Sequence, residues 1–176
     1  LRSGTGLSAL LLCSVSLPAP SLALYSEANY SRLEKHSSKP KSITSLAKEI
    51  ESRYGIPYEA VAAVAVLESK SGTSKLATTC NNFFGVKCFQ RHDHSKCLRL
   101  NNDKPNEPFR YFPTVDSCFS YFGKLTTTGR YRHKPHLQAN AFIEMIKSKG
   151  YATDPKYVAK LKYVAKRIES GTWIFP

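Results

Sequence analysis

The chain has 176 residues and a mass of 19.7 kDa, with 41% apolar and 22% charged residues. This composition excludes a disordered chain, and 10 prolines and 9 glycines exclude a fibrous one, so we expect one globular domain with short additional segments. The 26 lysines and arginines outnumber the 13 acidic residues, and the net charge of +13 favours an acidic partner such as nucleic acid, anionic lipid or an anionic wall polymer.

The first 23 residues have the layout of a secretory signal peptide. Arg2 precedes a mostly apolar run at 7–17, which is followed by two prolines and a small-residue segment ending at Ala23. The run is too short to cross a bilayer as a helix. The alternative to a signal peptide is a buried N-terminal helix. We therefore expect an exported protein, with residues 24–41 as a polar linker because they lack apolar periodicity.

Several stretches predict a helical core. Apolar residues recur at helical spacing over 43–54, and Gly55 follows at a position typical of helix ends. Residues 60–67 are apolar on every side, which is typical of a helix buried at the centre of a small domain. Further helices are predicted at 74–77, 114–125, 137–149 and 154–168.

Residues 86–112 predict a β-hairpin. Apolar residues in this stretch surround a segment rich in turn-forming residues, Asn101 to Pro108. The expected fold is therefore mainly α with one small β element. We expect the folded domain to cover 42–171, followed by a short tail at 172–176.

Cysteine usage predicts disulfide bonds. Cys13 lies in the signal peptide, and an even number of cysteines in the exported remainder suggests two disulfides. The preferred pairing is Cys88 with Cys97, which flank a short segment expected to fold back, and Cys80 with Cys118. The alternative is a zinc site, with suitable ligand types at an unusual spacing, formed by Cys88, His92, His94 and Cys97. We expect the disulfides and no metal.

Glu68 is unusual because a carboxylate follows directly on the long apolar run. Burial disfavours the charged form of a carboxyl group and raises its pKa. A carboxylic acid that stays protonated near neutral pH can give its proton to a departing oxygen, as glycoside hydrolysis requires. The alternative is that Glu68 lies on the first exposed turn after the buried helix.

Motifs around and after Glu68 occur in a defined order along the chain. They are Leu67–Ala77, which begins Leu67-Glu68-Ser69, then Asn81–Lys87, which begins Asn81-Asn82-Phe83-Phe84-Gly85, then Phe109-Arg110-Tyr111-Phe112, then Gly129-Arg130-Tyr131, and finally Gly150–Tyr157, which begins Gly150-Tyr151-Ala152-Thr153-Asp154-Pro155. This set, over about residues 43–170, closely resembles glycoside hydrolase family 73, the bacterial peptidoglycan β-N-acetylglucosaminidases. The resemblance implies a lysozyme-like α+β fold with a β-lobe beside a substrate groove. It also implies hydrolysis of the β-1,4 bond between N-acetylglucosamine and N-acetylmuramic acid.

The resemblance further implies roles for individual residues. Glu68 matches the general acid of the family. Tyr151 matches an aromatic residue that lines the site and orients the sugar or water, with packing at a helix boundary as its alternative. We expect the amides of Asn81 and Asn82 either to bond the N-acetyl group or to brace the groove, with a purely structural turn as the alternative. The other expected substrate-binding residues are Phe84, Tyr111, Tyr131 and Tyr157.

The second carboxylate is where this sequence departs from the family. An inverting glycosidase places a base ~6.5–9.5 Å from the acid, and a retaining one places a nucleophile at ~5–5.5 Å. Family members usually carry a glutamate in the β-lobe, but the matching stretch here, 98–103, contains none. The candidates are Asp103 and Glu107, which are also ordinary residues for a turn. Without them, the N-acetyl oxygen of the substrate could assist.

Two alternatives to hydrolysis follow from the same resemblance. A lytic transglycosylase acts on the same polymer with one glutamate, and an inactive relative binds the cell wall without cutting it. The export signal argues against nucleic acid as the partner. No phosphate-binding loop, nucleotide fingerprint or Ser-His-Asp pattern stands out in the sequence, and no cofactor is implied. We expect a monomer without a membrane span that acts on peptidoglycan glycan strands, in the envelope or outside a bacterial cell.

Overall fold

The structure, a computed structural model, describes residues 41–88, 97–101 and 105–173. The predicted signal peptide and nearly all of the predicted linker lie outside these residues, as do His92, His94 and Asp103. The elements in chain order are α2 (Ile43–Tyr54), α3 (Tyr58–Ser69), α4 (Lys75–Cys80), β1 (Cys97–Leu100), β2 (Glu107–Arg110), α5 (Val115–Thr127), η2 (Gly129–Tyr131), α6 (Ala139–Ser148) and α7 (Tyr157–Glu169).

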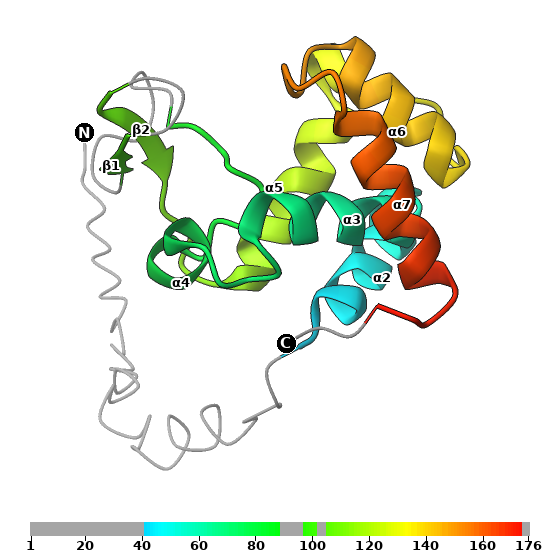
Figure 1. Ribbon diagram of the computed structural model, residues 1–176, viewed down its shortest axis with the longest axis horizontal. Coiled ribbons are helices and arrows are strands. Elements are labelled where there is room, and N and C mark those ends of the chain that lie inside the picture. The colour runs from blue at the N-terminus through cyan, green and yellow to red at the C-terminus, as the bar shows by residue number, and fades with distance from the viewer. Residues whose placement is uncertain (1–40, 89–96, 102–104, 174–176) are drawn as a thin grey trace, which may run out of the picture. The chain divides into compact units, whose positions relative to one another are not determined.

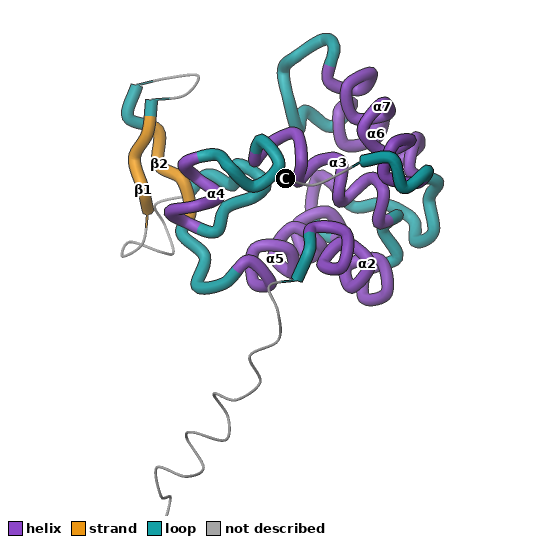
Figure 2. Tube along the Cα trace, turned by 60° about the horizontal axis from the view of Figure 1, so that its bottom comes forward, coloured by secondary structure: helices purple, strands orange, loops and turns teal. Residues whose placement is uncertain are grey.

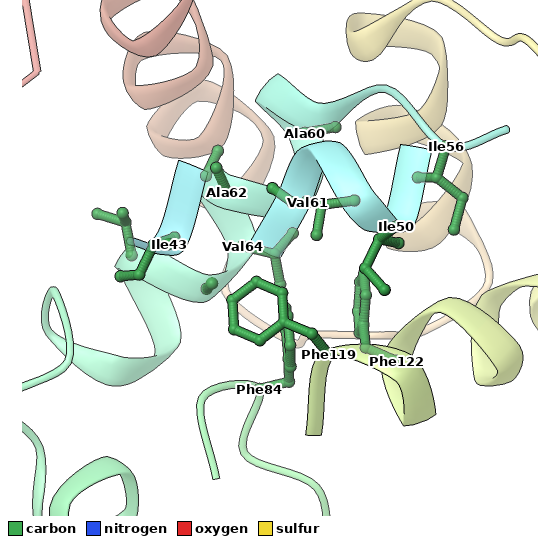
Figure 3. Packing of buried hydrophobic residues seen from close by; sticks show 14 of the residues in the cluster. Ile43, Ile50, Ile56, Ala60, Val61, Ala62, Val64, Phe84, Phe119 and Phe122 are labelled. Carbon is green, nitrogen blue, oxygen red and sulfur yellow. The ribbon is translucent and has the colours of Figure 1, made fainter. Parts of the chain in front are cut away.

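Helix α3 is the centre of the described domain. Every side chain from Ala60 to Val66 is buried, as the apolar run predicts. The helix packs against α2, α6 and α7 (Figure 1). On another side, Val64 faces a cluster of aromatic side chains (Figure 3). They belong to the loop after α4 and to α5, and are Phe84, Phe119 and Phe122.

The ends of the helices follow the local chemistry of the sequence. Ser42 begins α2, with its side chain accepting from the amide of Ser45 at 3.1 Å, and Gly55 ends it with φ +66. Thr114 caps α5 through a reciprocal capping box. Helix α7 begins at Tyr157, slightly later than predicted, because residues 154–156 form a turn ahead of it.

The predicted β-hairpin is present as two short antiparallel strands. Strand β1 pairs with β2 from Cys97 opposite Arg110 to Leu100 opposite Glu107. The segment at 86–88 also hydrogen-bonds to β2 through the amides of Cys88 and Arg110. Figures 1 and 2 show the hairpin beside α4, on the far side of α5 from α6 and α7. The domain is therefore mainly α with one small sheet, as expected.

The predicted Cys80–Cys118 disulfide is wrong, because both residues are buried free cysteines. The Sγ of Cys118 instead accepts a hydrogen bond from the amide of Phe83 at 3.4 Å. Burial raises the pKa of the Cys118 thiol to about 12. The side chain of Cys97 lies outside the described residues, so its bond to Cys88 stays a prediction. No helix in the described part of the chain combines the length and apolar character that crossing a membrane requires.

Candidate active site

Glu68 lies in the last turn of α3, where the chain leaves the helix abruptly. The three residues at 70–72 all have positive φ, so the backbone turns away and leaves the Glu68 side chain partly buried. Ser69 fixes this turn. Its hydroxyl donates to the carbonyl of Ala65 at 2.5 Å and accepts from the amide of Gly72 at 2.8 Å. The end of the apolar helix thus presents one carboxyl group in a defined place.

The carboxyl group of Glu68 lies between α7 and the loop after α4. Its Oε1 accepts a hydrogen bond from the hydroxyl of Tyr157 at 2.8 Å. Its Oε2 lies near Gly85, where an added Cβ atom would come within 3.6 Å of that oxygen. Gly85 has φ +62, so the backbone of a larger residue there would be strained. The exposed-turn alternative for Glu68 therefore does not describe this geometry.

Three tyrosines form a cluster next to Glu68. The ring centroid of Tyr151 lies 5.7 Å from that of Tyr131 and 6.2 Å from that of Tyr157. The hydroxyl of Tyr151 donates to the carbonyl of Phe84 at 3.1 Å. Burial, together with the nearby charge of Glu68, raises the pKa of both Tyr151 and Tyr157 well above the ordinary value. Both phenols therefore keep their protons at neutral pH and act as donors.

The two asparagines brace the loop that carries Gly85. Asn82 is 1% exposed, and its amide donates to the carbonyls of Val86 and Arg110, both at 2.9 Å. Its Oδ1 accepts from the amide of Val86 at 3.0 Å. Asn81 donates to the carbonyl of Phe112 at 2.9 Å. The geometry therefore favours the bracing alternative over a bond to the N-acetyl group.

The predicted substrate-binding aromatics divide into two groups. Phe84 is buried at 3% exposure and stacks on Phe122 with ring centroids 4.0 Å apart, so its ring belongs to the core. Tyr157 is equally buried, and its hydroxyl donates a hydrogen bond to Glu68. Tyr111 is 37% exposed and Tyr131 is partly buried, so these two keep ring surface that a sugar can contact.

Of the two candidates for the second carboxylate, Glu107 is the one that lies within the residues described by the structure. It is the first residue of β2, and its side chain is 10% exposed. Its Oε1 accepts from the Nζ of Lys87 at 2.6 Å, so the hairpin holds a buried carboxylate in an ion pair. Asp103 lies outside the described residues.

Three residues shape the site although the sequence predicted no role for them. Ser69 closes the turn after Glu68, and Gly85 lies beside Oε2. Arg130 donates to the carbonyl of Lys149 from Nε at 3.1 Å and from Nη2 at 2.7 Å, which ties η2 to the end of α6 and holds Tyr131 against Tyr151. All three residues lie within the motifs around Glu68, and this position in the sequence could have indicated a role in the site.

A separate pocket of about 570 Å³ lies at the other end of α3. Its lining includes Glu59 near the start of α3, together with Gln138 and Glu169. Burial raises the pKa of Glu59, with the charges of Glu51 and Glu169 adding to the effect. The pocket does not include Glu68, so the tyrosine cluster and the pocket are different regions of the domain.

A glucosaminidase family model, described as mannosyl-glycoprotein endo-beta-N-acetylglucosaminidase, matches residues 44–170. The chain belongs to this glucosaminidase family. The expected membership of glycoside hydrolase family 73, and with it the class of glycoside hydrolases, is thereby confirmed. The match covers every motif around Glu68, from Leu67 to Tyr157.

Curated members of the glucosaminidase family show moderate similarity. The chain is 27% identical over 143 residues to exo-glucosaminidase LytG of Bacillus subtilis, covering 73% of this chain and 50% of that protein. It is 26% identical over 139 residues to peptidoglycan hydrolase FlgJ of Pseudomonas aeruginosa, covering 71% and 35%. The chain thus spans half or less of these relatives.

A solved structure has the same fold as the present protein. The crystal structure of a peptidoglycan hydrolase from Sphingomonas sp. A1 matches with a TM-score of 0.63 and 23% identity. The match covers 73% of this chain and 90% of that chain. The helical domain with its small two-stranded sheet is therefore the lysozyme-like fold expected from the motifs.

Proposed function

We propose that this protein is a peptidoglycan hydrolase that cleaves the β-1,4 bond between N-acetylglucosamine and N-acetylmuramic acid, with Glu68 as its general acid. One observation carries the proposal: a partly buried carboxyl group at the end of a buried helix, with Oε1 bonded to Tyr157 and Oε2 beside Gly85. The family and the stated functions of the two curated relatives support the substrate class.

The proposed reaction transfers one proton from Glu68 to the glycosidic oxygen. As the bond between this oxygen and the anomeric carbon breaks, the leaving sugar departs as a neutral alcohol instead of an alkoxide. The oxygen of a water molecule then bonds to the anomeric carbon, and a base accepts the water proton. Returning that proton to Glu68 restores the enzyme, so the net reaction consumes one water for each bond cleaved.

Glu107 and Asp103 stay the candidates for this base. A base must be ionised, and Glu107 forms an ion pair with Lys87, whose Nζ lies 2.6 Å from Oε1. The variants Glu107→Gln and Asp103→Asn separate the candidates, because loss of the base lowers kcat by about 10²-fold or more. If both variants keep wild-type kcat, the N-acetyl oxygen of the substrate takes over the role.

A second candidate activity is lytic transglycosylation of the same polymer. Glu107 is engaged with Lys87, and a transglycosylase needs no second carboxylate. Its product carries an anhydro-muramic acid end, formed when the muramic acid closes on itself without water. Mass spectrometry of the released fragments separates the two reactions, and wall binding without any fragments would indicate an inactive binding module.

The proposed location is outside the cytoplasmic membrane of a bacterium, since peptidoglycan lies there. The predicted signal peptide at 1–23 supports export. The expected outcome of expressing the full chain in a bacterium is a mature protein that begins after Ala23, which N-terminal sequencing measures. An uncleaved protein retained in the cytoplasm would contradict this location.

Digestion of purified peptidoglycan tests the function. The wild-type protein is expected to release new reducing ends of N-acetylglucosamine, whereas Glu68→Gln, which cannot donate the proton, releases none. The matched control is Glu144→Gln, an exposed glutamate on α6 that pairs with Lys162, which is expected to keep full activity. Equal release by the wild type and Glu68→Gln would remove Glu68 from its role.

A further inference from the structure

We infer that Tyr157 is the positioning residue of the general acid: its hydroxyl holds Oε1 of Glu68, so that Oε2 is the oxygen that carries and delivers the proton. The inference rests on the proposed role of Glu68. It replaces the expectation that Tyr157 binds substrate, because the ring is buried and its hydroxyl is already bonded to the carboxyl group.

The position of Tyr157 is fixed by the start of α7. Tyr157 is the first residue of this helix and is 3% exposed. Its amide donates to the carbonyl of Asp154 at 3.2 Å. The carboxylate of Asp154 accepts from the amide of Lys156 at 2.8 Å and from the Nζ of Lys160 at 2.7 Å. This turn therefore fixes the position of the Tyr157 hydroxyl next to Glu68.

The two helices that supply the pair lie against each other. Glu68 lies in the last turn of α3, Tyr157 begins α7, and these helices pack side by side in the core (Figure 1). The ring of Tyr151 lies 6.2 Å from the ring of Tyr157 and limits its movement. The distance of 2.8 Å between the hydroxyl and Oε1 therefore joins two groups held by packed helices.

A phenol that keeps its proton decides which carboxyl oxygen is protonated. The Tyr157 hydroxyl donates to Oε1, so the proton of a neutral carboxyl group is placed on Oε2. Oε2 lies beside Gly85, where an added Cβ atom would come 3.6 Å from that oxygen. The hydrogen bond therefore both stops rotation of the carboxyl group and directs its proton toward the Gly85 side.

The other titratable groups include Tyr151 and Tyr131 around Tyr157, and Cys118 next to Tyr151. Burial raises the pKa of Tyr151 and of Cys118, and phenols and thiols with such pKa values are uncharged at neutral pH. Removing the Tyr157 hydroxyl thus deletes a donor without changing the charge of these neighbours. A donor to a carboxylate stabilises its ionised form, so its removal makes the carboxyl group hold its proton to higher pH.

The variant Tyr157→Phe tests the inference, because it deletes only the hydroxyl and keeps the ring. We expect kcat on peptidoglycan to fall about 10- to 100-fold, the range for losing a hydrogen bond to a charged group. KM is expected to change by less than about threefold, since the buried ring does not contact substrate. The alkaline limb of the kcat/KM profile, where the general acid loses its proton, should move to higher pH.

Tyr163→Phe is the matched control. It makes the same deletion on the same helix at a residue that is 60% exposed, and it is expected to leave kcat and the pH profile unchanged. Wild-type kcat and an unmoved alkaline limb in Tyr157→Phe would overturn the inference. A lower melting temperature with proportional loss of activity and no change in the limb would also overturn it, since that pattern belongs to a purely structural role.

Glu68→Gln in the same assay separates this inference from the proposed function. If Glu68→Gln is inactive while Tyr157→Phe behaves like the wild type, the function stands and the positioning role fails. If Glu68→Gln stays active, the function fails. Should Tyr157→Phe not fold, the ¹³Cζ resonance of Tyr157 in the wild-type protein serves instead. It is expected to shift as Glu68 titrates, and a resonance without this response would refute the contact.

Discussion

Asn82 is the residue whose replacement best separates bracing from substrate binding. Its side chain makes three hydrogen bonds to buried or partly buried backbone, two as a donor to carbonyls and one as an acceptor from the amide of Val86. In Asn82→Ala, these backbone groups lose their partners, each at a cost of about 1–3 kcal/mol. Because water can enter part of the vacated space, we expect a loss of about 3–5 kcal/mol in the free energy of unfolding.

Urea unfolding, followed by circular dichroism, measures this loss. The control is Asn140→Ala, an exposed asparagine on α6, which is expected to stay within about 0.5 kcal/mol of the wild type. Activity per folded molecule should also fall, because the loop braced by Asn82 carries Gly85 against Glu68. If Asn82→Ala keeps wild-type stability but raises KM strongly, Asn82 binds the sugar and the bracing argument is refuted.

Asn82→Asp sharpens the same test. An aspartate keeps an oxygen to accept from the Val86 amide but replaces the NH₂ donor, so a carboxylate would face two backbone carbonyls. We expect it to be at least as destabilising as Asn82→Ala at pH 7, and less so at low pH where the carboxyl group becomes protonated. A sugar-binding asparagine would not give this pH dependence of stability.

Two further predictions concern the surroundings of the site. In Gly150→Ala, the new Cβ would lie 2.8 Å from Nη2 of Arg130, at a position with φ +79. We expect a loss of about 1–3 kcal/mol on thermal unfolding and lower activity, because Tyr151 follows directly; full stability would contradict the geometry. For Cys118, burial raises the thiol pKa from 9.0 to about 12. Its contribution to stability is therefore complete below about pH 9 and is lost as pH rises toward 12. The difference in unfolding free energy between the wild type and Cys118→Ala should shrink over that range, and a constant difference would refute the shift.

The central helix could be predicted because one pattern determines it. A run that is apolar on every side, 60–67, has no stable position except inside the core, and the structure buries Ala60 to Val66. Gly55 and Thr114 likewise carry their own local signals as helix-ending and helix-starting residues. The predicted Cys80–Cys118 pairing failed because an even number of cysteines gives no information on geometry, and the amide of Phe83 is the partner of the Cys118 sulfur.

The site itself was predictable only in part, because its contacts join distant parts of the chain. The motifs singled out Glu68, Tyr151 and Tyr157, but no spacing rule shows that a hydroxyl 89 residues away donates to the Glu68 carboxyl group. The packing of α3 against α7 creates that contact, and it turns an expected sugar ligand into a partner of the acid. Motifs therefore identify which side chains a site needs, whereas helix packing decides which of them face substrate and which hold one another.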